Sequence, residues 1–193
     1  TTINKMCGSG MKATMFGHDL LVAGSAQVVV AGGMESMTNA PYLLPNARSG
    51  MRMGHGEVKD HMFLDGLEDA YEPGKLMGAY AEATAQSYQF TRESQDAFAI
   101  SSLERARKAS EDGTFAKEIV PVTVKSRKGE TVVEIDEQPG NAMPEKIPSL
   151  RPAFAKDGTV TAANSSSISD GAAALILMRQ SEAEKRGLKP LAV

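Results

Sequence analysis

The sequence predicts an α/β protein in which helices and strands form layers. Apolar side chains recur at helical spacing between Gly8 and Gly24, which predicts a helix. The run "AQVVVAGG", from Ala26 to Gly33, is continuously apolar and valine-rich, which is typical of a strand covered on both faces. A second apolar run, "AAALILM", follows near the end of the chain at 172–178. A helix followed by a buried strand is the basic unit of α/β proteins.

The composition of the sequence changes after the first predicted strand. From Ser36 to about Asp65 it is rich in proline, glycine and methionine without periodicity, which predicts a long irregular excursion. Residues 74–90 and 91–113 then predict two helices, the second capped by Thr91 and ended by Gly113. Two alternating runs in 118–137, on either side of "RKG", predict a β-hairpin.

The last third of the chain predicts a return to the apolar layer. Pro139 to Pro152 has the composition of a linker, and it leads through "TVTAANSSSISDG" into the strand at 172–178. A short helix is expected to begin at Ser181. Because few residues precede Cys7 and the chain ends on a strand-like "LKPLAV", the sequence is expected to be a piece of a larger protein.

Composition excludes several classes of function. A net charge of −3, with acidic and basic residues interspersed, gives no surface suited to nucleic acid. One cysteine and three scattered histidines provide no metal-binding spacing, so no metal is expected. No apolar run approaches the ~20 residues that span a membrane, and no signal pattern opens the chain. We expect a cytoplasmic protein, or a mitochondrial matrix protein if the source is eukaryotic.

Cys7 is the strongest candidate for a catalytic residue. It stands just before a Gly-Ser-Gly turn that opens a helix, where the helix dipole and unpaired backbone N–H groups favour the thiolate form. Gly8 and Gly10 allow a substrate carbonyl to approach, and backbone N–H groups can bind its oxyanion. This arrangement suits acyl transfer through a covalent intermediate. The alternative is that Cys7 is a small buried apolar residue, as many lone cysteines are.

The segment around Cys7 resembles the nucleophile segment of thiolases, specifically those of the biosynthetic, acetyl-CoA acetyltransferase type. Further matches follow in family order and at family spacing over essentially the whole chain: "NKMCGSGMKA", "VVVAGGMESMTNAPY", "GLEDAY", "LMGAYAE", "SQDAFA", "EIVPV", "LRPAF" and "GTVTAANSSSISDGAAA". So many matches are far more specific than any one glycine motif.

The resemblance implies a thiolase-like layered α/β fold, here a partial chain from the middle portion of a thiolase. Residues 1–35 would end the N-terminal core domain. Residues 36–167 would form an inserted α+β loop domain that binds coenzyme A and joins dimers into a homotetramer. Residues 168–193 would return to the core and start the C-terminal domain.

The implied reaction is the condensation of two acetyl-CoA molecules to acetoacetyl-CoA and coenzyme A, with thiolysis as its reverse. Cys7 would carry the acyl group, and coenzyme A thioesters would be substrates, with no separate cofactor. By the same resemblance, Met77 would line the acyl pocket. Phe154 and Ile168 would line the pantetheine tunnel, and Ser166 would bind the pantetheine amide.

Each of these site residues also has a purely structural explanation. Met77 and Ile168 lie in apolar patterns where core packing is the default, and Ser166 lies in a serine run that suits a turn or a cap. His18 is expected to be structural or exposed. His55 and His61 lie in the irregular segment, without the carboxylate spacing of a metal site.

The sequence also departs from the family. It contains no "NEAF", no "GHP" and no later cysteine, the motifs that supply the other catalytic groups of thiolases, so the isolated chain is expected to be inactive. Leu76 replaces a histidine found in many short-chain enzymes, and Pro139 replaces an arginine near the nucleotide in some. Three alternatives therefore stay open: a degradative 3-ketoacyl-CoA thiolase, a catalytically incomplete CoA-binding or oligomerising module, and a cysteine hydrolase using His18 or His55.

Overall fold

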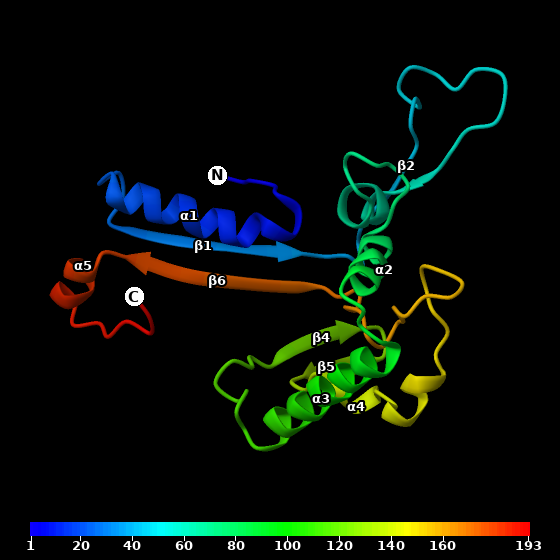
Figure 1. Ribbon diagram of the computed structural model, residues 1–193. Coiled ribbons are helices and arrows are strands. Elements are labelled where there is room, and N and C mark those ends of the chain that lie inside the picture. Colours follow the sequence, from blue (N-terminus) through cyan, green and yellow to red (C-terminus); the bar gives the residue numbers. More distant parts are fainter. The chain divides into compact units, whose positions relative to one another are not determined.

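The computed structural model describes all residues from Thr1 to Val193. The chain divides into two compact units, shown in Figure 1. The first unit comprises Thr1–Leu76 together with Ile168–Val193, and the second comprises Met77–Ser167. The first unit carries the layered helix-on-sheet arrangement that the sequence predicts.

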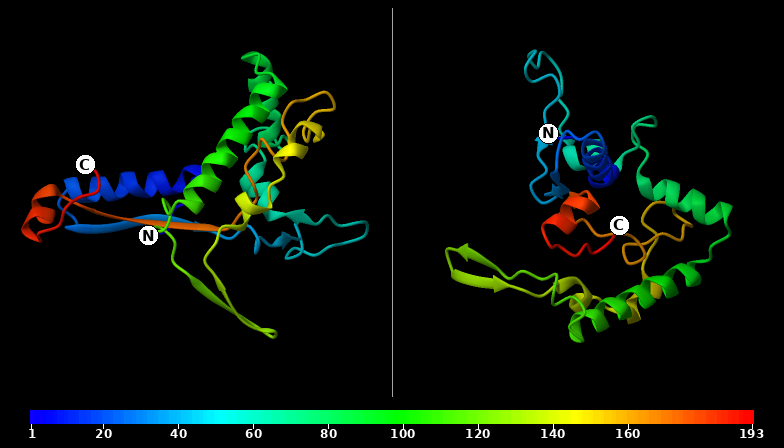
Figure 2. Two further views of the ribbon diagram at one scale, coloured as in Figure 1. Left: turned by 90° about the horizontal axis from the view of Figure 1, so that it is seen from below. Right: turned by 90° about the vertical axis from the view of Figure 1, so that its left-hand side faces the viewer.

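A helix lying on a two-stranded antiparallel sheet forms the first unit. Helix α1 (Ser9–Val22) contacts strand β1 (Val28–Glu35), which pairs with strand β6 (Gly171–Met178). Val28 lies opposite Met178, and Glu35 opposite Gly171. Figures 1 and 2 show the two strands side by side along their whole length, with α1 running along them. The predicted helix and both predicted strands are confirmed.

Strand β1 extends two residues past Gly33, where the apolar run recognised in the sequence ends. Gly32 and Gly33 pair with Ala174 and Ala173, so the backbone ladder continues to Glu35. A Cβ atom on Gly32 would collide with the Ala173 carbonyl oxygen, which explains why only glycine fits there. Glycine in this strand therefore permits a close approach of backbones and does not break the strand.

Another glycine lets α1 approach the sheet closely. Gly17 is buried, and a Cβ atom there would lie 2.9 Å from Cδ1 of Leu177 and 3.2 Å from Cγ1 of Val29. Ala31 on β1 and Leu21 on α1 are also buried. This contact is the apolar core of the first unit.

The sequence predicted that the first strand is covered on both faces, and for the described residues this is wrong. Side chains alternate along a strand, so Val29 and Ala31 face α1 while Val28 and Val30 face the opposite side. Val30 and its partner Ile176 are each 69% exposed. An apolar face of this kind is typical of a surface that contacts another segment or another subunit.

Residues 36–76 are mostly irregular, as predicted, with three short regular pieces. Strands β2 (Tyr42–Leu43) and β3 (Lys59–Asp60) pair antiparallel, and a π-helical turn, η2 (Phe63–Leu67), follows. The beginning of this stretch is held by Asp170, whose carboxylate accepts hydrogen bonds from the Thr38 N–H at 2.9 Å and the Ser36 hydroxyl at 3.3 Å.

The last helix, α5 (Gln180–Lys185), begins slightly earlier than predicted. Its N-cap residue is Arg179 and not Ser181, and the Arg179 side chain does not cap the helix. The Arg179 guanidinium donates to the carbonyl oxygens of Leu21 at 2.8 Å and Val22 at 3.0 Å. It thus neutralises the C-terminal end of α1, where a positive charge is favourable.

Two helices dominate the second unit. Helix α2 (Met77–Ser87) is shorter than the predicted 74–90, and helix α3 (Arg92–Glu111) is confirmed. Thr91 caps α3 as predicted, because its hydroxyl accepts a hydrogen bond from the Ser94 N–H at 3.1 Å. Gly113, with φ of 79°, lies just past the C-cap of α3, where glycine is favoured.

The predicted hairpin is also confirmed, formed by β4 (Val122–Ser126) and β5 (Gly129–Val133). The predicted linker at 139–152 is wrong, because it contains most of helix α4 (Glu137–Asn141) and the 3-10 helix η3 (Pro144–Ser149). Arg107 of α3 explains part of this order. Its guanidinium donates to the carbonyl oxygens of Pro139 and Ala142, each at 2.8 Å.

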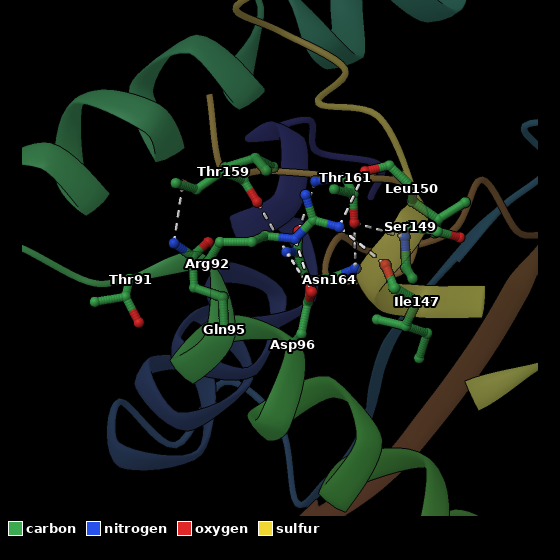
Figure 3. Close-up of polar contacts among 12 residues, drawn as sticks. Thr91, Arg92, Gln95, Asp96, Ile147, Ser149, Leu150, Thr159, Thr161 and Asn164 are labelled. Carbon is green, nitrogen blue, oxygen red and sulfur yellow. Dashed lines mark hydrogen bonds and ion pairs between the residues drawn. The ribbon is translucent and has the colours of Figure 1, made fainter. Parts of the chain in front are cut away.

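A polar network around Arg92 ties α3 to η3 and to the segment at 159–164 (Figure 3). The Arg92 guanidinium donates to the buried Asp96 carboxylate at 2.7 Å and to two backbone carbonyl oxygens, those of Ile147 and Leu150. Asn164 completes the network, because its amide donates to Asp96 at 3.1 Å. No buried side-chain nitrogen or oxygen lacks a partner.

A second polar contact fixes the same segment on α2. The Glu82 carboxylate accepts hydrogen bonds from the Thr159 N–H and hydroxyl and from the Val160 N–H, at 2.8–3.1 Å. Burial alone would raise the pKa of Glu82. The backbone and hydroxyl donors outweigh it and hold this pKa below its usual value.

We predict that Asp96→Asn lowers the free energy of unfolding by about 2–4 kcal/mol, because it leaves the Arg92 charge without its buried partner. Urea unfolding followed by circular dichroism measures the change. Glu104→Gln, on the exposed side of the same helix, is the matched control and should change stability by less than about 0.5 kcal/mol. Equal effects of the two substitutions would contradict this role for Asp96.

We predict that Glu82→Gln lowers the free energy of unfolding by about 1–3 kcal/mol at neutral pH. Because the pKa of Glu82 is lower in the folded chain than its ordinary value of 4.5, the ionised carboxylate stabilises the fold above that pH. This contribution is lost as pH falls through the folded-state pKa. Urea unfolding at a series of pH values should therefore show the gap between the two proteins narrowing on acidification, and a constant gap would argue against the prediction.

Candidate functional site

Cys7 lies in a tight turn directly before α1, and its side chain is exposed. The turn is a 3-10 helix, η1 (Met6–Gly8). Two polar side chains bind the backbone of Met6. Asn4 Oδ1 accepts a hydrogen bond from the Met6 N–H at 2.9 Å, and the Ser9 hydroxyl donates to the Met6 carbonyl oxygen at 2.7 Å. Both the N–H and the carbonyl group of Met6, the residue before Cys7, are therefore held by hydrogen bonds.

Met6 adopts a backbone conformation that is unfavourable for methionine. Its φ is 49°, in the left-handed region, which costs a residue with a Cβ atom roughly 1–2 kcal/mol. The hydrogen bonds from Asn4 and Ser9 offset this cost. Strained backbone that is held by its surroundings is common at functional sites, and here it directly precedes Cys7.

The start of α1 lies close to the end of β1. A Cβ atom added at Gly33 would lie 4.0 Å from the Gly10 Cα, so the two backbones approach each other near the turn. The N-cap residue Gly8 has no side chain, and no side chain caps the first turn of α1. Backbone N–H groups at a helix start of this kind can bind negative charge. Turn η1 also contacts η2.

Sequence reasoning singled out Cys7 but missed Asn4 and Ser9, which hold its turn. The signal was available, since asparagine and serine favour turns through hydrogen bonds from their side chains to nearby backbone. The motif "NKMCGSG" carries both at the right spacing. The strain at Met6 has no equivalent signal, because methionine does not predict a left-handed conformation.

In the second unit, Met77 and Phe154 lie at the start of α2 and in the loop that packs against it. Met77 is the first residue of α2 and is 44% exposed. The Phe154 ring lies directly against Gly78, where a Cβ atom would collide with three of its ring atoms. Phe154 itself is 39% exposed. The structure thus places these two predicted site residues in one neighbourhood, both open to solvent.

Ser166 and Ile168 lie in the segment between the polar network of the second unit and strand β6. Both are exposed, and Ile168 is 58% exposed, so neither is packed in a core in this structure. Ser166 belongs to the second unit and Ile168 to the first, together with Cys7. Nearby Asp170 has its pKa lowered, chiefly by the Thr38 N–H, and it anchors this end of the segment.

Two of the three histidines have carboxylate partners. His18 is exposed on α1 and lies 3.2 Å from Asp19, in agreement with a surface role. His61 Nε2 lies 2.8 Å from Asp65 Oδ2, four residues further on, an ion pair that the sequence analysis did not anticipate. This pair spans the start of η2.

The described residues contain neither a cluster of metal ligands nor a membrane-spanning helix. No group of three or more histidine, cysteine, aspartate and glutamate side chains is arranged to hold a metal ion. No helix combines the length and the apolar character needed to cross a membrane.

Comparison with known proteins identifies relatives over the whole chain. An acetyl-CoA acetyltransferase of Schizosaccharomyces pombe is 49% identical, and the match covers 100% of this chain and 49% of that protein. The structure of an acetyl-CoA acetyltransferase from Syntrophomonas wolfei superimposes with a TM-score of 0.92 at 45% identity, covering 99% of this chain and 48% of the other. The Acat5 thiolase from Ascaris suum, solved in complex with coenzyme A, gives 0.88 at 44% identity, covering 98% and 48%.

The chain therefore spans about half the length of these relatives. The family model that matches residues 1–181 is that of the thiolase N-terminal domain. The expectation that the chain represents the middle portion of a thiolase is accordingly corrected to the N-terminal half. Since the match covers most of the chain and the fold agrees with two solved relatives, this chain belongs to the thiolase family.

Proposed function

We propose that the protein is an acetyl-CoA C-acetyltransferase that condenses two acetyl-CoA molecules to acetoacetyl-CoA and coenzyme A, and catalyses the reverse thiolysis. One observation carries the proposal. Cys7 stands exposed in a strained, doubly hydrogen-bonded turn before α1, in a chain that is 49% identical along its whole length to an acetyl-CoA acetyltransferase.

In the first half of the reaction, Cys7 acts as the nucleophile. Its thiolate sulfur attacks the thioester carbonyl carbon, and the electron pair of the carbonyl moves onto oxygen. The oxyanion then collapses, the bond to the coenzyme A sulfur breaks, and the released thiolate takes up a proton. The products are an acetyl-cysteine and free coenzyme A. Support comes from the open approach to Cys7 and from the uncapped first turn of α1, which is suited to an oxyanion.

In the second half, the acetyl group moves from Cys7 to a second acetyl-CoA. A base removes a proton from the methyl carbon of that molecule, the resulting carbanion attacks the acetyl-cysteine carbonyl, and the cysteine thiolate leaves. We assign to Cys7 only the acyl-carrying role. The thiolase motifs that would supply the base are not among these residues.

We further propose that Met77 lines the acyl pocket and that Phe154, Ser166 and Ile168 contact the pantetheine arm. The proposal is supported by exposure, since all four side chains are open to solvent. A long thioester arm needs apolar walls with a few polar anchors, and this set has that composition. The relative solved with coenzyme A bound belongs to the same family.

Assembly and location stay predictions. A homotetramer, with residues 36–167 as the segment that binds coenzyme A and joins dimers, agrees with the exposed apolar face of β1 and β6 and with the fully exposed strands of the hairpin. A cytoplasmic or mitochondrial matrix location would suit a free thiol.

The first test of the proposal is acetylation of Cys7. Brief incubation of the protein with acetyl-CoA, followed by peptide mass mapping, should find one acetyl group on Cys7. Cys7→Ser should abolish the adduct on this peptide and the release of coenzyme A that accompanies it, because the nucleophile is lost. His18→Gln is the matched control on α1 and should leave both measurements unchanged.

The possible results separate the alternatives. A folded protein that binds coenzyme A but never acetylates Cys7 would overturn the enzyme proposal and favour the CoA-binding or oligomerising module. Loss of reaction in His18→Gln would favour a cysteine hydrolase. Faster thiolysis of long-chain 3-ketoacyl-CoA than of acetoacetyl-CoA would favour a degradative thiolase.

We predict that Asn4→Ala and Ser9→Ala each slow acetylation of Cys7 by about 5-fold, since each removes a hydrogen bond, worth about 1 kcal/mol, that holds the strained turn. Asn4→Asp keeps the accepting oxygen and should restore most of the rate. The measurement is the rate constant for Cys7 acetylation in a rapid-mixing experiment. Identical rates in Asn4→Ala and Asn4→Asp would count against the positioning role.

A further inference from the structure

The backbone conformation of residue 78 in α2 does not require glycine, so the presence of Gly78 needs another explanation. It is the second residue of the helix and has no left-handed φ, so an alanine could adopt its conformation. Alanine is favoured over glycine inside a helix by about 1 kcal/mol. A glycine at such a position therefore needs another reason, and close approach by a neighbouring group is the usual one.

The neighbouring group is the ring of Phe154. A Cβ atom on Gly78 would lie well within 3.0 Å of the ring atoms Cε2, Cδ2 and Cζ, closer than real Cβ atoms lie to any neighbour. The ring thus rests against the backbone of the first turn of α2. Phe154 is 39% exposed, so part of its ring is open to solvent.

The loop that carries Phe154 has little freedom to retreat. The Ala153 N–H donates to the Val160 carbonyl oxygen at 2.9 Å, which closes the loop. Glu82, one helical turn after Gly78 on the same face of α2, binds the backbone of Thr159 and Val160. A side chain at position 78 would therefore be accommodated by turning the ring outward and not by moving the loop away.

We propose that Gly78 is a specificity-determining residue that sets the position of the Phe154 ring and thereby the width of the passage for the acyl-CoA arm. The proposal rests on the proposed function, which assigns Met77 and Phe154 to the substrate. A methyl group at position 78 would drive the ring toward its open side, where the thioester arm would pass. A displacement on the order of 1 Å at a group that contacts substrate can cost about 10²-fold in rate.

The test compares Gly78→Ala with the double variant Gly78→Ala/Phe154→Leu. The single substitution is expected to raise the dissociation constant for coenzyme A about 10-fold or more and to slow acetylation of Cys7 at low acetyl-CoA concentration. The double variant should bind coenzyme A about as well as Phe154→Leu alone, because leucine lacks the ring that the methyl group displaces. The dissociation constant is measured by calorimetric titration with coenzyme A and does not depend on turnover.

Gly140→Ala is the matched control. Gly140 also lies in a helix of the second unit, and a Cβ atom there would meet nothing within 4 Å. This substitution should leave both the acetylation of Cys7 and coenzyme A binding unchanged. Thermal unfolding of all variants should show the double variant to be at least as stable as Gly78→Ala.

The outcomes distinguish this inference from the proposed function. If wild-type Cys7 is acetylated but Gly78→Ala binds coenzyme A normally, the inference is overturned and the proposed function stands. If Cys7 is never acetylated while coenzyme A binding falls in Gly78→Ala and recovers in the double variant, only the catalytic proposal fails. If Phe154→Leu does not restore coenzyme A binding to Gly78→Ala, then Gly78 serves another neighbour and the inference is overturned. The same conclusion follows if Gly78→Ala does not fold and Phe154→Leu does not restore its folding.

Discussion

The antiparallel register of β1 against β6 is the constraint on which the first unit depends. Val29 lies opposite Leu177, and both side chains face Gly17 of α1. Because side chains alternate along a strand, a slip of one residue would turn this pair away from the helix and bring the exposed Val30 toward it. Helix α1 lies in contact with the sheet only in this register, and the turn that carries Cys7 is the direct continuation of α1.

Local patterns in the sequence were sufficient to predict the elements that depend on local physics. The spacing of apolar residues predicted α1, the threonine at position 91 predicted the start of α3, and alternation around "RKG" predicted the hairpin. Each of these rests on contacts within a few residues, such as the Thr91 hydroxyl binding the Ser94 N–H. The residues themselves therefore carry the information.

Contacts between distant segments could not be predicted in the same way. Glu82 binds Thr159, which is 77 residues away, and Arg107 orders a stretch that has the composition of a linker. The exposed face of β1 was missed for a related reason. An apolar run indicates that a strand is suited to burial, but it does not indicate which element covers each face. At the site, Cys7 was evident from its motif, whereas the roles of Met77, Phe154, Ser166 and Ile168 rested on family resemblance and stay predictions.

Residues 36–170 form one long loop whose two ends are joined where β1 pairs with β6. This closure affects how the protein tolerates insertions and deletions. Glu35 lies opposite Gly171, and the Asp170 carboxylate binds the Thr38 N–H, so residues 36–170 leave and re-enter the sheet through one fixed stem. The entropic cost of such a closed loop grows only with the logarithm of its length. Insertions and deletions in the exposed loops of residues 36–170 are therefore inexpensive for the sheet, provided that they leave this stem and the contacts of Asp96 and Glu82 intact.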